Sequence, residues 1–292
     1  FGAIADKSQI FQLIKAIRSG RKIIAQVAPA FVGQFGPGVT PDMIKTALKQ
    51  LGFADVYETA IGADMGAAAE AEHYVHAVAT GELPFLLTSC CPSWSVLAKK
   101  FFPETIDNIS NALTPMVATA RKIKEDHPDA SVVFIGPCAS KKLEASRKSV
   151  RSDVDFVITF EELAGMFDAK GIELKGVEPE DTMADATGAG RGYGVAGGVA
   201  SAIEACIREY YPDVEVNIEH AESLAECRKM LMLAKAGKKN GCLIEGMACP
   251  GGCIAGAGTN IAIPQAMKEV NAFKMAAEKK IPEVTNKKES EG

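Results

Sequence analysis

Five cysteines in three short turns have the residue type and spacing needed for metal chemistry. The turns are "LLTSCCPSW", "FIGPCASKKLE" and "EGMACPGGC", and their cysteines are Cys90, Cys91, Cys138, Cys249 and Cys253. Three of these cysteines have a neighbouring proline, which restrains the turn and removes an N–H donor. Gly251 and Gly252 let the last turn fold back on itself. Thiolates in such turns are the ligands that zinc and iron–sulfur clusters prefer.

Other uses of these thiols remain open at this point. Four cysteines satisfy a structural zinc site, but such sites usually combine two CxxC-like knuckles, whereas here single cysteines come from distant segments. A redox dithiol of Cys90 and Cys91 is disfavoured because adjacent cysteines form a strained ring. All five thiols could also be inert. Burial as isolated thiols is our prediction for the three remaining cysteines, Cys206, Cys227 and Cys242.

The segments that must position the cysteines alternate between strand and helix patterns. Short β-rich runs predict strands at 21–29, 55–59, 84–90, 131–138, 155–160 and 214–220. Helices are predicted to begin at Pro41 after the cap residue Thr40, in "CPSWSVLAKKF", in "TPMVATARKIKED" and near Gly197 after a glycine-dense loop. We therefore expect an α/β fold of two packed lobes, with largely parallel sheets flanked by helices. Because the carboxyl ends of parallel strands converge on a ligand crevice, one cluster buried between the lobes is expected.

Composition argues against several classes of partner. The formal net charge is -5, and Lys and Arg are scattered, so nucleic acid is not an expected partner. No apolar run reaches the roughly 18 residues of a membrane helix, and no signal-peptide pattern opens the chain. We expect a cytoplasmic protein with no membrane partner. The polar end of the chain, residues 277–292, is expected to be a disordered tail.

Together, the three cysteine stretches resemble the signature motifs of the iron-only (FeFe) hydrogenases, in order and in spacing. The resemblance covers about residues 26–264 and implies that residues 1–276 form the catalytic H-cluster domain. In that family four cysteines hold a 4Fe-4S cubane, and one of them bridges to a two-iron subcluster that carries CO, cyanide and a bridging dithiolate. Carried over to this chain, the ligands are Cys91, Cys138, Cys249 and Cys253, with Cys253 as the bridge.

The chain start adds a further expectation. "FGAIADKSQI" is similar to the sequence that follows the last cysteine-proline pair of a bacterial ferredoxin module. An N-terminal ferredoxin-like domain is therefore expected upstream of Phe1 and is absent from this chain.

The family resemblance also implies a proton relay. Cys90 would exchange protons with the two-iron unit, and Glu70, Ser110 and Glu144 fall where relay residues fall. At the solvent end the family has a second glutamate, and the alignment leaves His73 and Glu72 open for this place. The alternative interpretation of "EAEHYVHAV" is a solvated helix face, which would apply to Glu72 and His76.

Four more residues are implied to surround the two-iron unit. Lys141 resembles a lysine that donates to a cyanide nitrogen, which would be a charge-assisted contact. Otherwise it would be interpreted as a surface lysine of "SKKLE", because lysine is rarely buried. Ala28 and Pro29 resemble backbone that contacts another diatomic ligand, and Met247 resembles a packing contact.

Several positions depart from the family pattern. Gly136 replaces a methionine before "PC", Ser93 a glycine after "CCP" and Met116 a glutamine after "TP", while Ala257 and Thr259 interrupt a "GGGQ" run. The ligands are kept and the two-iron pocket is altered, which indicates a divergent subgroup.

The resemblance implies reversible reduction of protons to H2, with ferredoxin as electron partner and with maturation proteins that install the two-iron unit. The alternatives are an H2 sensor with slow turnover and a non-catalytic iron–sulfur protein related to cluster-assembly factors.

Overall fold

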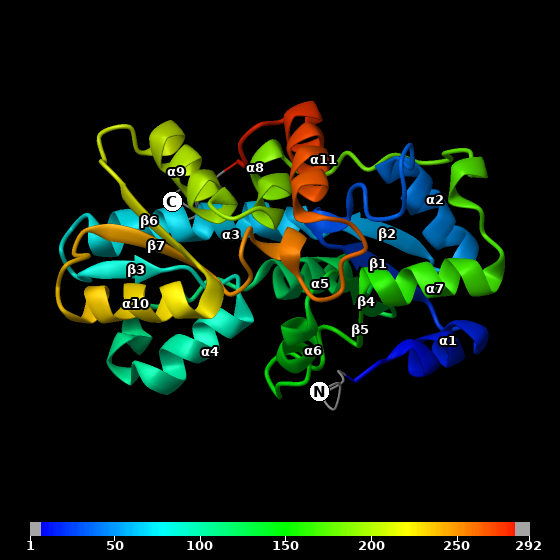
Figure 1. Cartoon of the computed structure of the whole chain (residues 1–292), viewed down its shortest axis with the longest axis horizontal. Helices are drawn as coiled ribbons and strands as arrows, with labels where there is room; N and C mark the ends of the chain where they lie inside the picture. The colour runs from blue at the N-terminus through cyan, green and yellow to red at the C-terminus, as the bar shows by residue number, and fades with distance from the viewer. Residues whose placement is uncertain (1–6, 284–292) are drawn as a thin grey trace, which may run out of the picture.

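Two parallel sheets lie side by side in the computed structural model, which describes residues 7–283 (Figure 1). The strands are β1 (Ile23–Val27), β2 (Asp55–Glu58), β3 (Phe85–Leu87), β4 (Ser131–Ile135), β5 (Phe156–Ile158), β6 (Asn217–Glu222) and β7 (Cys242–Met247). The larger sheet has the order β2-β1-β4-β5 and the smaller sheet β3-β7-β6, and all neighbouring strands are parallel. The predicted α/β class with parallel sheets is confirmed. Strand β7 was not among the predicted strand ranges.

Helices cover both sheets. They are α1 (Ile10–Arg18), α2 (Pro41–Leu51), α3 (Ala60–His73), α4 (Pro92–Phe101), α5 (Pro115–Asp126), α6 (Ala139–Ala145), α7 (Phe160–Lys170), α8 (Gly188–Arg191), α9 (Gly198–Tyr210), α10 (Ser223–Lys235) and α11 (Ile263–Ala276). On the smaller sheet, α9 packs on one face and α4 and α10 on the other (Figure 1). Helix α3 contacts both α9 and α5, which packs on the larger sheet, so α3 connects the two halves.

Local sequence explains where the helices begin. The Thr40 side chain accepts a hydrogen bond from Met43 N at 3.2 Å, and Pro41 is the first residue of α2, as predicted. Prolines also begin α4 and α5, in the two segments where helix starts were predicted. Because proline lacks an N–H and has a preset φ, it costs nothing at the first helical position.

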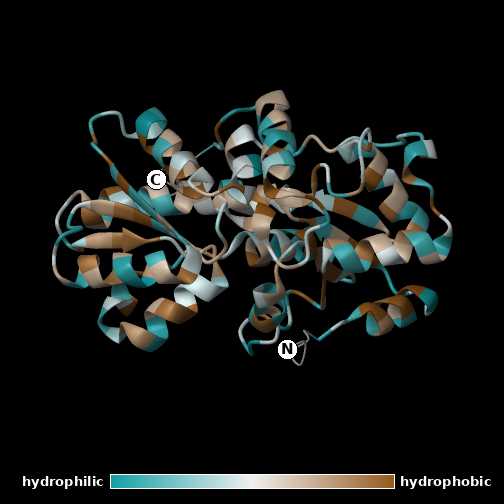
Figure 2. Cartoon of the chain, viewed as in Figure 1, coloured by the Kyte–Doolittle hydropathy of each residue, from teal (hydrophilic) through white to brown (hydrophobic). Residues whose placement is uncertain are grey.

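Alternating side chains in β3 supply two separate cores. Leu86 packs on the α9 face, whereas Phe85 and Leu87 pack on the face covered by α4 and α10. In Figure 2 the inner strands are largely hydrophobic, whereas the hydrophilic residues gather on β6 at the edge of the smaller sheet and on the outer helices and loops. Both faces of β3 and β7 are therefore buried, as expected for a parallel sheet, whereas the edge strand β6 is partly exposed.

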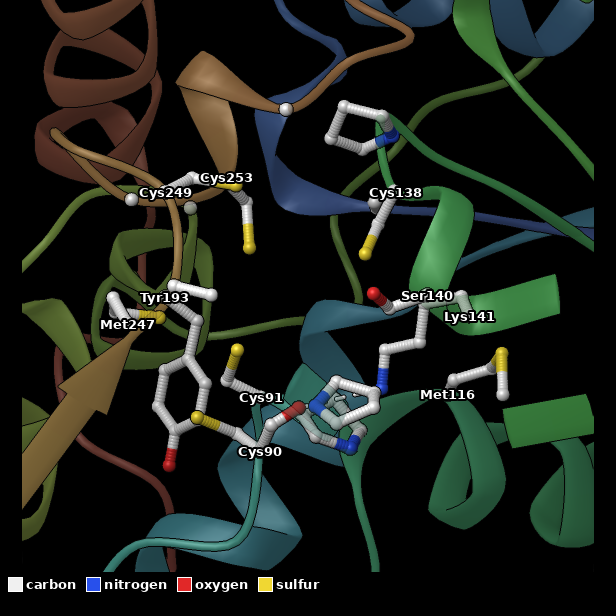
Figure 3. A pocket seen from close by; sticks show the side chains of 18 of the residues that line it. Cys90, Cys91, Met116, Cys138, Ser140, Lys141, Tyr193, Met247, Cys249 and Cys253 are labelled. Atoms are coloured by element: carbon white, nitrogen blue, oxygen red, sulfur yellow. Dashed lines mark hydrogen bonds between the residues drawn. The ribbon is translucent and has the colours of Figure 1, made fainter. Parts of the chain in front are cut away.

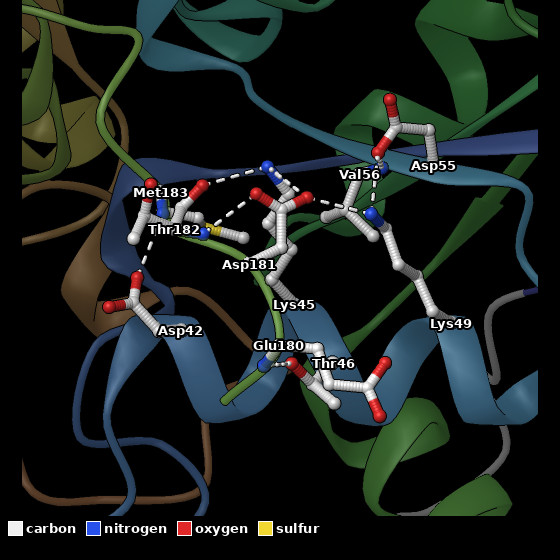
Figure 4. Close-up of polar contacts among 10 residues, drawn as sticks. All are labelled: Asp42, Lys45, Thr46, Lys49, Asp55, Val56, Glu180, Asp181, Thr182 and Met183. Atoms are coloured by element: carbon white, nitrogen blue, oxygen red, sulfur yellow. Dashed lines mark hydrogen bonds and ion pairs between the residues drawn. The ribbon is translucent and has the colours of Figure 1, made fainter. Parts of the chain in front are cut away.

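Polar contacts tie the segment between α7 and α8 to helix α2 (Figure 4). Lys45 Nζ donates to Thr182 O at 2.7 Å and pairs with Asp181 at 3.1 Å, and Lys49 pairs with Asp181 at 2.7 Å. Met183 N donates to an Asp42 carboxylate oxygen at 2.8 Å. These contacts hold the chain just before it enters α8.

Residues 277–283 follow α11 and return to α8. Gly188 N donates to Lys279 O at 2.8 Å, and Ala189 N donates to Lys280 O at 3.0 Å. The carbonyls of Lys279 and Lys280 thus accept the free N–H groups at the start of α8, whereas a disordered tail was predicted for 277–292. The rest of the predicted tail, 284–292, and the start of "FGAIADKSQI" lie outside the described residues. Within residues 7–283 we find no helix whose length and apolar character would suffice to cross a bilayer.

Candidate functional site

The carboxyl ends of four strands, two from each sheet, meet at one cavity. The registers Val27↔Ile135 and Leu87↔Ile244 bring the ends of each pair of strands to the same edge. The cavity has a volume of about 190 Å³ and a mostly apolar wall. All five predicted cysteines line it, together with Ala28, Pro29, Lys141 and Met247 (Figure 3). The structure therefore brings together every cysteine that was singled out for metal chemistry.

Two of the cysteines precede helices whose first turns face the cavity. Cys91 is the N-cap residue of α4, and Cys138 is the N-cap residue of α6. Burial raises the pKa of the Cys138 thiol, while the charge of Lys141 and backbone hydrogen bonds from Lys141 and Ser140 act to lower it. The start of α6 therefore directs N–H groups at the Cys138 sulfur atom, which favours a thiolate ligand there.

The turn that carries Cys249 and Cys253 depends on glycine. Gly252 has a φ of 91°, and a Cβ atom there would lie 2.5 Å from Ala196 N. Gly251 O accepts a hydrogen bond from Ala196 N at 3.0 Å. The turn thus packs directly on the backbone of the glycine-dense loop before α9, with no room for a side chain.

Burial favours the protonated form of the Cys249 and Cys253 thiols when no metal is bound. It raises the pKa values of Cys249 and Cys253, and neighbouring cysteines raise them further. The described cysteines form no disulfide. A bound metal would have to displace the thiol protons, so binding should release them.

The arrangement of the thiols fits a cluster better than a single ion. Within the described residues, no three His, Cys, Asp or Glu side chains are grouped closely enough to hold one metal ion. A zinc ion would require sulfur atoms about 4 Å apart, because Zn–S bonds are about 2.3 Å long. Thiols spread around an apolar cavity suit a larger iron–sulfur group.

Lys141 is a buried cation on the cavity wall. It is 8% exposed, so the interpretation as a surface lysine is wrong. Its Nζ atom lies 2.6 Å from a Glu144 carboxylate oxygen and donates to Cys90 O at 3.3 Å. Burial opposes the charge of Lys141, but the Glu144 carboxylate outweighs it and raises the lysine pKa. The site therefore presents a fixed positive charge beside Cys90.

Glu144 has contacts different from those expected of a relay residue after Ser110. One carboxylate oxygen accepts from Lys141 and the other from Thr114 Oγ1 at 2.8 Å. Both Glu144 oxygens therefore serve to hold Lys141 and the start of α5.

Glu70 is buried next to the Cys90 turn. Its carboxylate accepts from Ser89 N at 3.0 Å and from Ser89 Oγ at 3.2 Å. Burial raises the pKa of Glu70 to about 7, although hydrogen bonds from Ser89 and Ser110 lower it. Burial, and next the charge of Glu70, raise the pKa of the Cys90 thiol. Glu70 can therefore gain and lose a proton near neutral pH, as a relay residue must.

At the end of α3, the structure distinguishes Glu72 from His73, the two candidates for the solvent end of the proton relay. Glu72 is exposed, as is His76, in agreement with the solvated helix face. His73 lies one turn after Glu70 and is half-buried, and its buried Nδ1 atom has no hydrogen-bond partner among residues 7–283. A π-helical turn, Tyr74–Val78, follows His73 directly. His73 is thus the candidate on the Glu70 side of the helix.

Tyr193 is a cavity residue that the sequence pattern did not single out. Its ring lines the cavity, and its buried hydroxyl has no partner among the described residues (Figure 3). The glycine-dense segment that carries Tyr193 is held in place by Arg191, which donates to both Glu58 carboxylate oxygens at 2.8 and 2.7 Å. The glycines around Tyr193 were the only sequence signal that this loop approaches a ligand.

The departures from the family pattern cluster at the cavity. A Cβ atom on Gly136 would lie 2.6 Å from the Phe134 ring, so this ring fills the space of a larger side chain at 136. Ser93, Met116 and Ala257 line the cavity, whereas the Thr259 hydroxyl donates to Gly256 O at 2.9 Å.

The three remaining cysteines, Cys206, Cys227 and Cys242, are buried, as predicted, and do not line the cavity. Cys227 nevertheless lies just behind its wall, because its Sγ atom donates to Met247 O at 3.5 Å.

Comparisons with known proteins agree with this geometry. The family described as "Iron only hydrogenase large subunit, C-terminal domain" matches residues 21–257. Iron hydrogenase 1 of Clostridium pasteurianum is 30% identical over 94% of the chain, which spans only 56% of that relative. A cytosolic Fe-S cluster assembly factor, NAR1 of Kluyveromyces lactis, is 37% identical over 31% of the chain and 19% of its own length. The solved [FeFe]-hydrogenase HydA1 from Chlamydomonas reinhardtii has a similar fold, with a TM-score of 0.72 and 21% identity over 92% of the chain and 88% of its own.

Proposed function

Because the chain belongs to the family of the iron-only hydrogenase large subunit, C-terminal domain, we propose that residues 1–276 form a catalytic domain that interconverts protons, electrons and H2. The observation that supports this proposal most is the convergence of five thiols from both sheets on one apolar cavity. A buried cation and a carboxyl group with a near-neutral pKa flank the same thiols. Metal ligation and proton exchange are thus available in one place.

Four of the thiols are proposed to hold the cofactor. Cys91, Cys138, Cys249 and Cys253 would ligate a 4Fe-4S cluster, and Cys253 would bridge to a two-iron subcluster with CO, cyanide and a bridging dithiolate. When bound, the two-iron subcluster supplies the site at which H2 is formed or split. The apolar wall excludes water from it and thereby strengthens every charged contact.

Other cavity residues are proposed to orient the cofactor. Lys141, kept charged by Glu144, would donate to a cyanide nitrogen. The backbone at Ala28 and Pro29 would contact a diatomic ligand, and Met247 would pack beside it. Glu144 acts here as a positioning residue, because its two oxygens hold Lys141 and Thr114.

Protons are proposed to pass between Cys90 and Glu70. Ser110 adjusts the proton affinity of Glu70 through its hydrogen bond, and His73 carries protons further along α3. The expected relay ended at Glu144, and the route proposed here uses His73 because both Glu144 oxygens accept from Thr114 and Lys141.

The electron partner, the maturation proteins and the cellular location are also proposals. Ferredoxin is the proposed electron partner, maturation proteins would install the two-iron subcluster, and a cytoplasmic location would be tested by fractionating the source cells. The chain spans about half the length of its Clostridium relative. Ferredoxin-driven rates should therefore be compared with those driven by a small viologen, which needs no docking surface.

A direct experiment tests the function. The chain is matured anaerobically with the two-iron subcluster, and CO and cyanide infrared bands and H2 evolution from reduced viologen are measured. Intrinsic infrared bands with sustained H2 evolution are expected. Four bound irons with neither bands nor H2 evolution would contradict the proposal.

A second candidate is a non-catalytic iron–sulfur role. The observation in its favour is the partial match to the assembly factor NAR1, over 90 residues. In the same experiment this role predicts iron–sulfur absorbance without CO or cyanide bands, and an H2 sensor predicts the bands with slow turnover. The retained Cys90 thiol near Glu70 favours turnover, because a sensor needs no rapid proton delivery.

A further inference from the structure

Two serine hydroxyls meet on the cavity wall at the junction of the two halves of the molecule. Ser93 lies in the first turn of α4, which packs on the smaller sheet, and Ser140 lies in the first turn of α6, which follows β4 of the larger sheet. Their Oγ atoms are 2.6 Å apart. Such a separation is typical of a well-formed O–H···O hydrogen bond. This hydrogen bond links two segments that are far apart in the sequence, as does the contact from Lys141 Nζ to Cys90 O.

Both serines are placed to reach the proposed cluster. Each follows a proposed ligand by two residues, Cys91 in one case and Cys138 in the other. Both line the same cavity as the four ligand thiols. In Figure 3 the Ser140 side chain points toward the cavity, on the side on which the Cys138 thiol lies.

The pair has one more proton than its mutual hydrogen bond uses. A hydroxyl group donates one hydrogen bond, so whichever serine donates to the other, the second O–H is left over. In residues 7–283 neither Oγ atom makes another hydrogen bond. Both serine side chains are half-buried, and the surrounding cavity wall is mostly apolar. The remaining O–H is therefore free to donate to an acceptor placed in the cavity.

The Lys141 ammonium group is directed away from the place where the serine hydroxyl would find its acceptor. Its Nζ atom is already directed to Glu144 and to Cys90 O. The serine pair is therefore a donor additional to the lysine, and it lies between the Cys91 and Cys138 turns.

We infer that the Ser93–Ser140 pair donates one hydrogen bond to the sulfur atoms of the iron–sulfur cluster and thereby raises its reduction potential. Hydrogen bonds to cluster sulfurs stabilise the reduced state, because it carries more negative charge. The pairing holds the donating hydroxyl in place, since each serine fixes the rotamer of the other. This inference rests on the proposed function, because it requires the cluster at these ligands.

The test uses the cluster alone, without the two-iron subcluster. The chain is reconstituted anaerobically with iron and sulfide, and the cluster midpoint potential is measured by a redox titration followed by electron paramagnetic resonance. In the double variant Ser93→Ala with Ser140→Ala, reduction should become less favourable by about tenfold, which for a one-electron couple is about 59 mV. Each single variant should show a smaller fall, because the remaining hydroxyl can turn its proton toward the cluster.

Two controls separate this effect from a general disturbance. Ser146→Ala removes an exposed hydroxyl at the other end of α6 and should leave the potential unchanged. Ser140→Thr keeps a hydroxyl and should retain the parent potential. If the double variant loses iron, Ser140→Ala alone decides: a measurable fall in the midpoint potential that Ser146→Ala does not show is expected, and a parent potential overturns the inference.

The outcomes distinguish this inference from the function on which it rests. A parent potential in the double variant, or an equal fall in Ser146→Ala, overturns the inference while the parent protein still holds its cluster. Failure of the parent chain to bind a cluster overturns the proposed function and this inference with it.

Discussion

Replacing Glu70 by glutamine tests whether the fold sets the proton affinity of the residue beside Cys90. Glu70 is 2% exposed, and burial raises its pKa from 4.5 to about 7. Because the folded-state pKa lies above the unfolded value, folding favours the neutral acid. The carboxyl group therefore costs no stability below its unfolded pKa, and the cost grows as the pH rises from the unfolded toward the folded pKa.

The size of the effect follows from the same two pKa values. Each pKa unit corresponds to about 1.36 kcal/mol, so ionised Glu70 costs about 3 kcal/mol of folding free energy well above neutral pH. At about pH 5 the cost is below about 1 kcal/mol, because the folded state keeps the acid protonated. Between about pH 5 and pH 8 the parent should lose about 2–3 kcal/mol relative to Glu70→Gln.

Urea unfolding of the iron-free chain, followed by circular dichroism, measures this difference at both pH values. Glu209→Gln is the matched control, because it makes the same substitution at an exposed position on α9. The unfolding free energy of Glu209→Gln should change with pH in the same way as that of the parent. If Glu70→Gln also follows the parent across this range, the buried carboxyl does not have the raised pKa, and its assignment as a proton carrier loses its support.

Three further predictions concern the cavity. Replacing any one of three proposed ligands by alanine should remove most bound iron and its visible absorbance; the three are Cys91, Cys138 and Cys249. Full iron content in these variants would refute their assignment as ligands. Cys90→Ala should keep iron and the infrared bands but lose about 100-fold or more in H2 evolution, and a parent rate would show that protons enter elsewhere. Gly252→Ala should lower stability by about 2–3 kcal/mol, because it combines a positive φ with a backbone clash. Thermal unfolding of both variants measures this, and Gly237→Ala, with a φ of 73° and open space around its Cβ position, should cost less.

Much of the fold could be predicted because its signals are local. Thr40 and Pro41 mark the start of α2 through contacts within one turn, and apolar β-rich runs mark most strands. Strand β7 was not predicted as a separate strand, because its glycine and buried Glu245 interrupt the apolar pattern. Glu245 is accommodated only because its carboxylate accepts from Gly197 N and Ala200 N, each at 2.7 Å, at the start of α9. Such a partner is distant in sequence and leaves no local signal.

By itself, the sequence determined the class of the fold and the cysteines that face the cavity. Parallel strands end at a common edge, so residues just after them converge wherever the sheets pack. Only the tertiary structure decided the pairing of Lys141 with Glu144, the packing of Tyr193 and the contact between Ser93 and Ser140. The last joins two residues that are 47 positions apart and lie in different helices, α4 and α6. The proton affinity of Glu70 likewise depends on how completely distant segments exclude water from it, and no residue pattern within one element encodes that exclusion.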